Sequence, residues 1–282
     1  MKLRTIKSRV TGYPTEDGAG VSLVRVLGNS TTAEFDPVLM LDSFDSTDPS
    51  KYTAGFPMHP HRGIETVSYV YRGRMLHRDS LGNEDEISDG EVQWMTAGSG
   101  ILHEEALPAS ERLLGVQLWL NLPAAEKMTA PAYHSIKRDA IPEIDLEGGK
   151  LRLLAGRYGE HTGYLSEHLP VDYYDIHLNP GSEFRVETDP SRSVMLFTLV
   201  GGVEISGSAV KEKTAVKLTE GDYVTIKNGE QPAQVLFISS AALGEPVAWS
   251  GPIVMNTAEE LKQAFADLRS GKFLRDKMSY DN

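Results

Sequence analysis

The chain has 282 residues, more than one typical domain, and 40% hydrophobic and 24% charged residues, as in ordinary soluble globular proteins. Its formal net charge of -12 leaves no basic surplus for a general grip on phosphate backbones, so direct binding of nucleic acid is not expected. The absence of cysteine excludes disulfides, thiolate ligands and thiol nucleophiles, so any metal must be bound through nitrogen and oxygen.

The N-terminus is basic, but it lacks the apolar stretch that follows the basic residues of a signal peptide. No segment approaches the roughly 18 consecutive apolar residues that are needed to cross a bilayer. We therefore expect a cytoplasmic protein without a membrane partner.

Short apolar or β-branched segments separated by turn residues follow one another through the first half of the chain. The segments predicted as strands include 21–27, 35–41, 66–71, 91–95 and 113–120. Their spacing of about 8 to 12 residues indicates a β-sandwich or barrel. Residues 43–57, rich in Asp, Ser, Thr, Pro and Gly, are predicted to form a loop.

The second half repeats the first in outline. Residues 220–226 have the pattern of 89–95, an acid, a glycine, an acid and then alternating apolar residues. Such an echo predicts two copies of one β fold. We place the connection in the proline-containing segment 121–150, and predict domains 1–130 and 131–282.

The chain closes on a predicted amphipathic helix over 257–269, which ends at Gly271. Thr257 and Glu260 occupy the two positions of a capping box. The apolar stripe consists of Leu261, Ala264, Phe265 and Leu268.

Two histidine and glutamate groups supply candidate metal ligands. His59 and His61 precede Glu65, and about forty residues later His103 precedes Glu105. In a strand, side chains at positions i and i+2 share a face. His59 and His61 can therefore point to one side of their strand, and so can His103 and Glu105. Imidazole and carboxylate suit a divalent transition metal such as iron, copper, nickel or zinc. We predict a mononuclear metal site.

Other residues near these ligands have simpler roles. His77 is expected to be a hydrogen-bonded structural residue more than a support for a ligand. Trp94 and Met95 are expected to pack inside a barrel, with one of them facing the cavity. If the two halves align, Thr188 and Pro190 stand where the first half has His59 and His61, so the second copy is expected to be metal-free.

Four runs of sequence resemble the pirin family of the cupin superfamily. These are residues 55–67, 77–82, 92–103 and 251–257. The resemblance implies an all-β bicupin, two stacked antiparallel β-barrels of jelly-roll type with a short C-terminal helix. It also implies one metal in the N-terminal barrel and none in the C-terminal one.

The resemblance also implies a ligand set of three histidines and one glutamate. In this sequence these fall on His59, His61, His103 and Glu105. Ordinary cupins instead use the glutamate of the first motif, here Glu65, so the choice between Glu105 and Glu65 stays open. The metal implied is Fe(II), with manganese, copper, nickel, cobalt and zinc as alternatives.

Two functions follow from the resemblance. The first is a quercetin 2,3-dioxygenase activity: the metal captures the 3-hydroxyl and 4-carbonyl of a flavonol, Glu105 accepts the phenolic proton as the catalytic base, and dioxygen attacks the ring with release of carbon monoxide. The alternative is a non-enzymatic, iron-dependent redox regulator whose partner is a transcription factor or a metabolic enzyme. The same four ligands serve both, and a cavity large enough for a three-ring flavonol would favour the enzyme.

Overall fold

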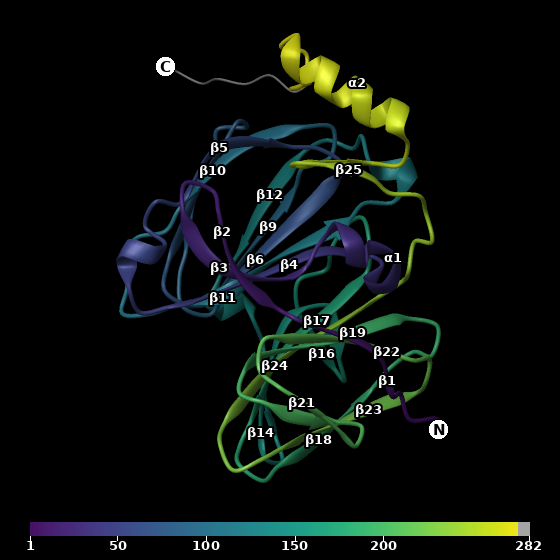
Figure 1. Cartoon of the computed structure of the whole chain (residues 1–282). Helices are drawn as coiled ribbons and strands as arrows, with labels where there is room; N and C mark the ends of the chain where they lie inside the picture. The colour runs from purple at the N-terminus through teal and green to yellow at the C-terminus, as the bar shows by residue number, and fades with distance from the viewer. Residues whose placement is uncertain (276–282) are drawn as a thin grey trace. The chain divides into compact units, whose positions relative to one another are not determined.

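The computed structural model of the protein describes residues 1–275, and it confirms the all-β fold with a short C-terminal helix. Two sets of strands each form a seven-stranded sheet and a four-stranded sheet (Figure 1). All of the strand pairings within these sheets described below are antiparallel. Within residues 1–275, none of the helices has the length and apolarity that crossing a bilayer requires.

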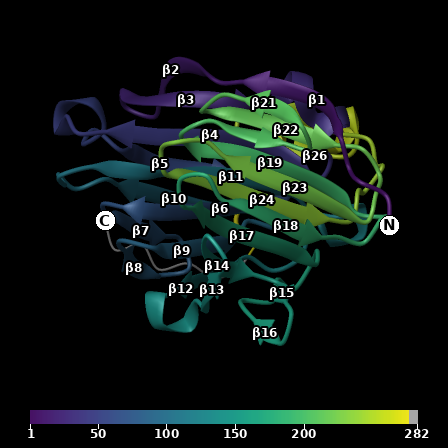
Figure 2. The ribbon, with the colours of Figure 1, turned by 90° about the horizontal axis from the view of Figure 1, so that it is seen from below.

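The first barrel combines a seven-stranded and a four-stranded sheet. The larger sheet has the order β12 (Ala132–Ile136), β9 (Glu91–Thr96), β6 (Ile64–Arg72), β11 (Leu113–Asn121), β4 (Val38–Ser46), β3 (Val21–Leu27) and β2 (Tyr13–Asp17). The smaller sheet has the order β5 (Phe56–His61), β10 (Ile101–Ala106), β7 (Met75–Asp79) and β8 (Glu84–Ile87), and these four strands can be followed side by side in Figure 2.

The second barrel is built in the same way. Its larger sheet has the order β1 (Ile6–Thr11), β22 (Thr214–Leu218), β19 (Ser193–Val200), β24 (Ala233–Ser240), β17 (Val171–Leu178), β14 (Gly149–Ala155) and β13 (Glu143–Leu146). Its smaller sheet has the order β18 (Glu183–Glu187), β23 (Tyr223–Asn228), β20 (Val203–Ile205) and β21 (Ser208–Val210). Buried aliphatic and aromatic side chains from both sheets form one core cluster.

The remaining elements are short, apart from one helix. The small hairpins are β15 (Arg157–Tyr158) with β16 (His161–Thr162), and β25 (Ala248–Ser250) with β26 (Ile253–Met255). The helices are η1 (Asn29–Thr31), α1 (Thr32–Phe35), η2 (Pro49–Lys51), η3 (Ala124–Glu126), η4 (Arg138–Ala140) and α2 (Ala258–Arg269). The capping box predicted for α2 is confirmed, since Thr257 and Glu260 each accept a hydrogen bond from the other's backbone N–H.

The N-terminal segment of the chain belongs to the second barrel, and the C-terminal segment belongs to the first. By contacts, the second barrel consists of Met1–Tyr13, Ala33–Pro37 and Asp139–Ala242, and the first barrel takes Pro14–Thr32, Val38–Arg138 and, within the described residues, 243–275. The C-terminal helix therefore belongs with the first barrel in these contacts. The cut at residue 130 stays a prediction of the domain boundary, and β12, which lies beyond that cut, pairs with β9 of the first barrel.

The internal repeat is present, but the sequence alignment of its strands is wrong by one strand. The residues after Gly90 form β9 in a seven-stranded sheet, whereas those after Gly221 form β23 in a four-stranded sheet. By sheet order, β23 corresponds to β10, and β18 corresponds to β5. The sequence alignment matched β9 with β23 because both strands alternate between apolar and polar residues in the same way. Neither β18 nor β23 contains histidine, and a metal-free second barrel stays a prediction.

Candidate metal centre

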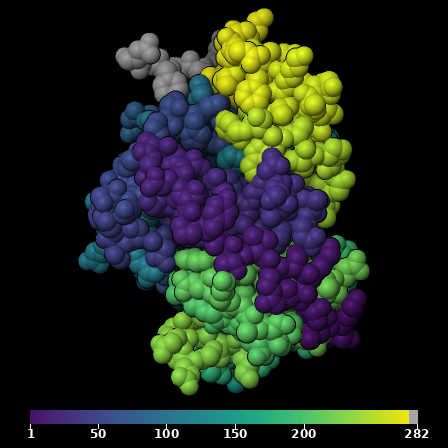
Figure 3. Space-filling view, viewed as in Figure 1, coloured from purple at the N-terminus to yellow at the C-terminus, as the bar shows by residue number. Residues whose placement is uncertain are grey.

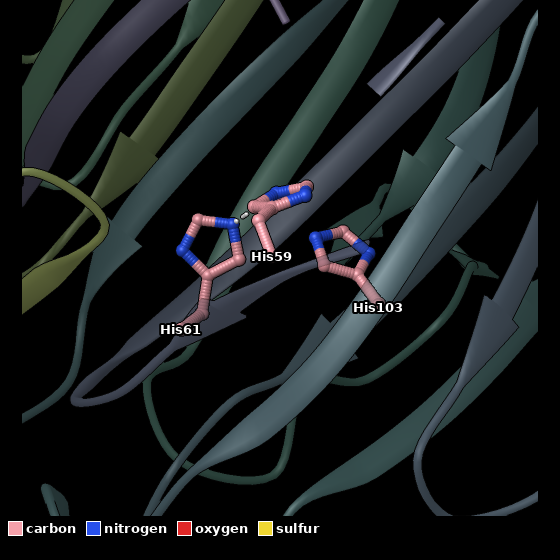
Figure 4. A group of neighbouring side chains, drawn as sticks. All are labelled: His59, His61 and His103. Carbon is pink, nitrogen blue, oxygen red and sulfur yellow. Dashed lines mark hydrogen bonds between the residues drawn. The ribbon is translucent and has the colours of Figure 1, made fainter. Parts of the chain in front are cut away.

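Three imidazoles meet on the inner face of the four-stranded sheet of the first barrel. His59 and His61 lie on β5 and His103 lies directly opposite His59 on β10, because the antiparallel register pairs these two residues. One potential ligand atom from each ring lies within 4.8 Å of the others. Figure 4 shows the three rings facing one another. The same-face pairing expected from the spacing of two residues is thus how the histidines come together.

Backbone carbonyls fix the rings of His59 and His61. The Nδ1 of His59 lies 2.9 Å from the carbonyl oxygen of Pro57, and the Nδ1 of His61 lies 3.0 Å from that of Pro252. A carbonyl can only accept, so each Nδ1 carries the hydrogen and each neutral ring presents a lone pair at Nε2. The two Nε2 atoms are 3.1 Å apart. Two facing lone pairs at that distance repel each other unless a cation is shared between them.

His103 completes the donor set from the buried side. Its side chain is fully buried, and neither ring nitrogen has a hydrogen-bond partner within the described part of the chain. Burial lowers the pKa of His103 well below its usual value and lowers the pKa of His61 to about 3, so both rings are neutral near pH 7. A buried polar group without a partner is costly, and coordination to a metal would satisfy it. The three histidines therefore fit a transition metal.

Glu105 lies near these histidines, but outside their group of ligand atoms. Its Oε1 accepts a hydrogen bond from Gln93 Nε2 at 2.5 Å, and its Oε2 accepts one from Gln117 Nε2 at 2.9 Å. The register between β10 and β5 shifts between His103 and Glu105, so Glu105 pairs with Phe56. Such a bulge re-aims side chains. The carboxylate still lines the same cavity as His59 and His61.

The other candidate carboxylate has a different environment. Glu65 lies on β6 of the seven-stranded sheet and accepts a hydrogen bond from Thr96 Oγ1 at 2.8 Å. It is buried, but it is not among the residues that line the cavity beside the histidines. The assignment of the fourth ligand to Glu105 instead of Glu65 stays a prediction.

His77 lies behind His103, with ring centroids 5.4 Å apart. Its Nε2 is 2.8 Å from Asp79 Oδ2, and both side chains are fully buried. The ring stacks on Tyr133 at a centroid distance of 4.2 Å. These contacts agree with the hydrogen-bonded structural role expected for His77, which packs against His103 and limits its movement.

A cavity of about 490 Å³ opens onto the histidines. This volume falls within the roughly 300 to 1,000 Å³ of small-molecule sites. Its apolar walls come from Met40, Phe56, Trp119 and Trp249. Its polar lining residues are Asp17, Arg25, Asp42, Glu105 and Gln117, in addition to His59 and His61. The cavity can therefore hold a largely apolar, planar ligand with a few polar groups.

Several residues of this site escaped the sequence reasoning. Gln93 lies on β9 inside the run 92–103, and Gln117 lies on β11 outside the four runs, but neither was singled out, because their contacts with Glu105 depend on strand register. Trp249 and Pro252 come from the C-terminal segment, and their approach to His61 depends on tertiary structure. Trp94 and Met95, which were expected to pack inside the barrel, are both buried. Neither of them lines this cavity.

Comparison with known proteins gives consistent matches along the whole chain. Residues 20–120 match the family model described as Pirin, and residues 173–274 match the model described as Pirin C-terminal cupin domain. A pirin-like protein of Caulobacter vibrioides is 42% identical over 97% of this chain and 100% of its own length. Human pirin is 36% identical over 91% of this chain and 89% of its own.

A solved structure gives the same result for the fold. The crystal structure of a quercetin 2,3-dioxygenase from Acinetobacter baumannii superposes with a TM-score of 0.90 and 32% sequence identity. The match covers 96% of this chain and 98% of that one. The likeness therefore includes both barrels.

Proposed function

We propose, since this chain belongs to the pirin family of cupin proteins, that it is a metal-dependent dioxygenase that cleaves flavonols of the quercetin type. One observation carries the proposal: three imidazoles converge at a cavity with apolar walls and room for a small aromatic molecule. The similarity to a solved quercetin 2,3-dioxygenase supports the substrate class.

The metal would be held by His59, His61 and His103, with Glu105 as the proposed fourth ligand. Fe(II) is the proposed ion, because imidazole and carboxylate ligands suit it, and manganese, copper, nickel, cobalt or zinc fit the same donors. When bound, the ion supplies Lewis acidity and, for iron, a one-electron redox couple.

The residues of the chain itself would position the substrate. Trp119 and Trp249, whose ring centroids are 5.6 Å apart, offer aromatic surfaces to a planar ring system. Met40 and Phe56 add apolar surface that excludes water from the reacting region. Flavonol and dioxygen are the proposed reactants.

Glu105 is the proposed proton acceptor for the phenolic hydroxyl. Its carboxylate faces the cavity, and the amides of Gln93 and Gln117 hold its two oxygens in a defined orientation. A general base must lie within hydrogen-bond reach of the proton that it takes, and a fixed carboxylate on the cavity wall meets that need for a hydroxyl directed at the histidines.

The test combines metal content with oxygen uptake. Wild type and His59→Ala are reconstituted with Fe(II), their metal is measured by mass spectrometry, and oxygen uptake is recorded with quercetin. His161→Ala is the matched control, since His161 is exposed on β16 of the second barrel. We expect His59→Ala to lose both metal and oxygen uptake, and His161→Ala to keep both.

Two other outcomes would contradict parts of the proposal. If wild type binds metal and His59→Ala does not, yet neither consumes oxygen with any flavonol, the dioxygenase proposal fails and the regulator implied by the family resemblance remains. If His59→Ala retains full metal occupancy, the metal site is assigned to the wrong residues.

A further inference from the structure

The C-terminal segment 248–275, called the strap below, forms part of the wall and support of the metal centre. Its Trp249, Gly251 and Pro252 line the cavity. The carbonyl oxygen of Pro252 accepts the hydrogen bond from His61 Nδ1 at 3.0 Å. The strap belongs to the first barrel by contacts, and Figure 3 shows it in yellow, packed on the blue residues of that barrel.

The strap is joined to the backbone immediately after His61. Arg62 and Ile253 form a parallel β-bridge, and the amide of Val254 donates to the carbonyl of Arg62 at 3.1 Å. Gly63 follows in a left-handed conformation with φ +79°, and a Cβ there would lie 2.0 Å from the carbonyl oxygen of Val254. Glycine at this position therefore permits the close approach of the strap to the ligand strand.

The Arg62 side chain fastens the far end of the strap. Its Nη1 lies 2.8 Å from Asp267 Oδ2 on α2, and its Nη2 donates to the carbonyl of Phe273 at 2.8 Å. Its Nε donates to the carbonyl of Ser99 at 2.7 Å, and its guanidinium lies 4.3 Å from the centroid of the Phe273 ring. Arg62 is only 2% exposed, so this is a desolvated charge, and its partners named here other than the Ser99 carbonyl lie in the strap.

These contacts connect α2 to a ligand through three short steps. Asp267 holds Arg62, Arg62 and its backbone hold the strand β26, and the residue before β26 holds the ring of His61. An imidazole that loses its Nδ1 acceptor can rotate about its χ2 angle and exchange the positions of its two nitrogens. Partners that orient a ligating histidine commonly change metal affinity 10- to 100-fold when they are lost.

We propose that the strap is a positioning element of the metal centre, and that Arg62 and Asp267 are positioning residues that slow metal release by keeping Pro252 on His61. The inference rests on the proposed metal centre, but not on the proposed reaction. Asp267 lies on α2, which contributes no residue to the cavity lining or to the group of candidate ligands. A role of Asp267 in metal binding therefore does not follow from the ligand motifs.

The experiment measures the release of Co²⁺ from the full-length protein to an excess of chelator, together with amide hydrogen exchange of residues 258–269. Asp267→Ala removes the acceptor of Arg62, while Glu259→Ala removes an exposed carboxylate from the same helix. We expect Co²⁺ to leave Asp267→Ala about 10-fold faster than wild type, with faster exchange in α2. Glu259→Ala should stay within about twofold of wild type, and Asp267→Glu should restore most of the slow release.

Co²⁺ also reports coordination through its visible spectrum, so a change of the ligand set is seen apart from any loss of fold. An unchanged release rate in Asp267→Ala overturns the inference, whether or not exchange in α2 rises. Equal acceleration in Asp267→Ala and Glu259→Ala also overturns it, because the effect would then be general destabilisation. Failure of wild type to bind Co²⁺ instead refutes the metal centre on which the inference rests.

Discussion

Gln117 donates from its Nε2 to both carboxylate oxygens of Glu105, at 2.9 Å to Oε2 and 3.2 Å to Oε1. Gln93 donates to Oε1 from the neighbouring strand, so two amides hold one carboxylate on the cavity wall. Hydrogen bonds to an ionised acceptor are about twice as strong as neutral ones. The pair of glutamines therefore sets the direction of this carboxylate on the cavity wall.

Replacing Glu105 by glutamine should separate its chemical and structural roles. An amide in place of the carboxylate loses the charge-assisted bonds, which should lower the free energy of unfolding by about 1 to 3 kcal/mol. If the carboxylate accepts the substrate proton, kcat should fall by about 10²- to 10⁴-fold. Steady-state oxygen uptake and denaturant unfolding measure the two effects. Glu104→Gln, on the opposite face of the same strand, should change neither by much, and a Glu105→Gln enzyme with normal kcat would exclude the proton role.

His103→Leu should stabilise the metal-free protein while it removes metal binding. In the metal-free protein both ring nitrogens of His103 are buried without a hydrogen-bond partner within residues 1–275, and leucine removes that cost, about 1 to 2 kcal/mol. His77→Leu is the matched comparison. Because it takes a donor from buried Asp79, it should destabilise the protein. Urea unfolding of both variants and wild type without metal checks the signs, and destabilisation by His103→Leu would contradict the idea that this ring is held ready for a ligand.

Trp249→Ala should weaken flavonol binding more than it slows the chemical step. The indole lines the cavity beside Trp119 and is anchored by a hydrogen bond from its Nε1 to the carbonyl of Gly251 at 2.8 Å. Loss of one aromatic contact of about 1.4 kcal/mol corresponds to a rise in KM of about tenfold. Trp249→Phe should show a smaller rise. A fall in kcat with KM unchanged would place the substrate elsewhere in the cavity.

Lys127 should make stability depend on pH in the alkaline range. Burial lowers the pKa of Lys127 to about 8 from its usual value near 10.5, while its Nζ donates to the Gly63 carbonyl at 2.7 Å. Between pH 8 and 10.5 the unfolded chain holds a proton that the folded protein has released, so stability from this group rises with pH, by at most about 1.4 kcal/mol per pH unit. The group favours folding least below pH 8.

Lys127→Met tests this dependence by difference. The gap in unfolding free energy between metal-free wild type and Lys127→Met should widen in favour of wild type as pH rises from 8 to 10.5. Chemical denaturation at several pH values measures it. A difference that stays constant over that range would show that the folded lysine keeps an ordinary pKa, and a difference that shifts against wild type would show a raised one.

Thr257→Ala should destabilise helix α2 locally. Thr257 Oγ1 accepts from the Glu260 amide at 3.1 Å, and Glu260 Oε2 accepts from the Thr257 amide at 2.9 Å. Loss of an N-cap hydroxyl costs about 0.5 to 2 kcal/mol. Amide exchange in residues 258–269 should quicken in Thr257→Ala and stay near the wild-type rate in Thr257→Ser. Unchanged exchange in the alanine variant would mean that packing alone sets the stability of α2.

Much of the fold was predictable, because the signals lie in local patterns. The strands around residues 21–27, 66–71 and 113–120 alternate or run apolar between glycine turns, and the α2 capping box is visible in the letters alone. The segment 35–41 was predicted to be a single strand. In the structure α1 ends at Phe35, and the strand β4 begins only at Val38. Residues 121–150, expected to be a connection, contain β12, which pairs with the sequence-distant β9, and β13, which forms a hairpin with the next strand, β14.

The candidate site was predictable only in part. The spacing of two residues placed His59 and His61 on one face of a strand, whereas His103 joins them through the register between β10 and β5. Gln93, Gln117 and Pro252 could not be found in this way. Their contacts arise from register and from a backbone carbonyl, and neither leaves a mark in residue type or spacing.

The exchange of chain ends between the barrels has a consequence for synthesis on the ribosome. The ligand strands β5 and β10 are complete in sequence at Ala106, but the carbonyl that orients His61 belongs to Pro252, which is synthesised much later. In the interval between the synthesis of His103 and that of Pro252, the histidines are present while their support is not. Chains that stop short of Pro252 should therefore lack a finished pocket, so uptake of the ion is expected to follow the synthesis of that residue.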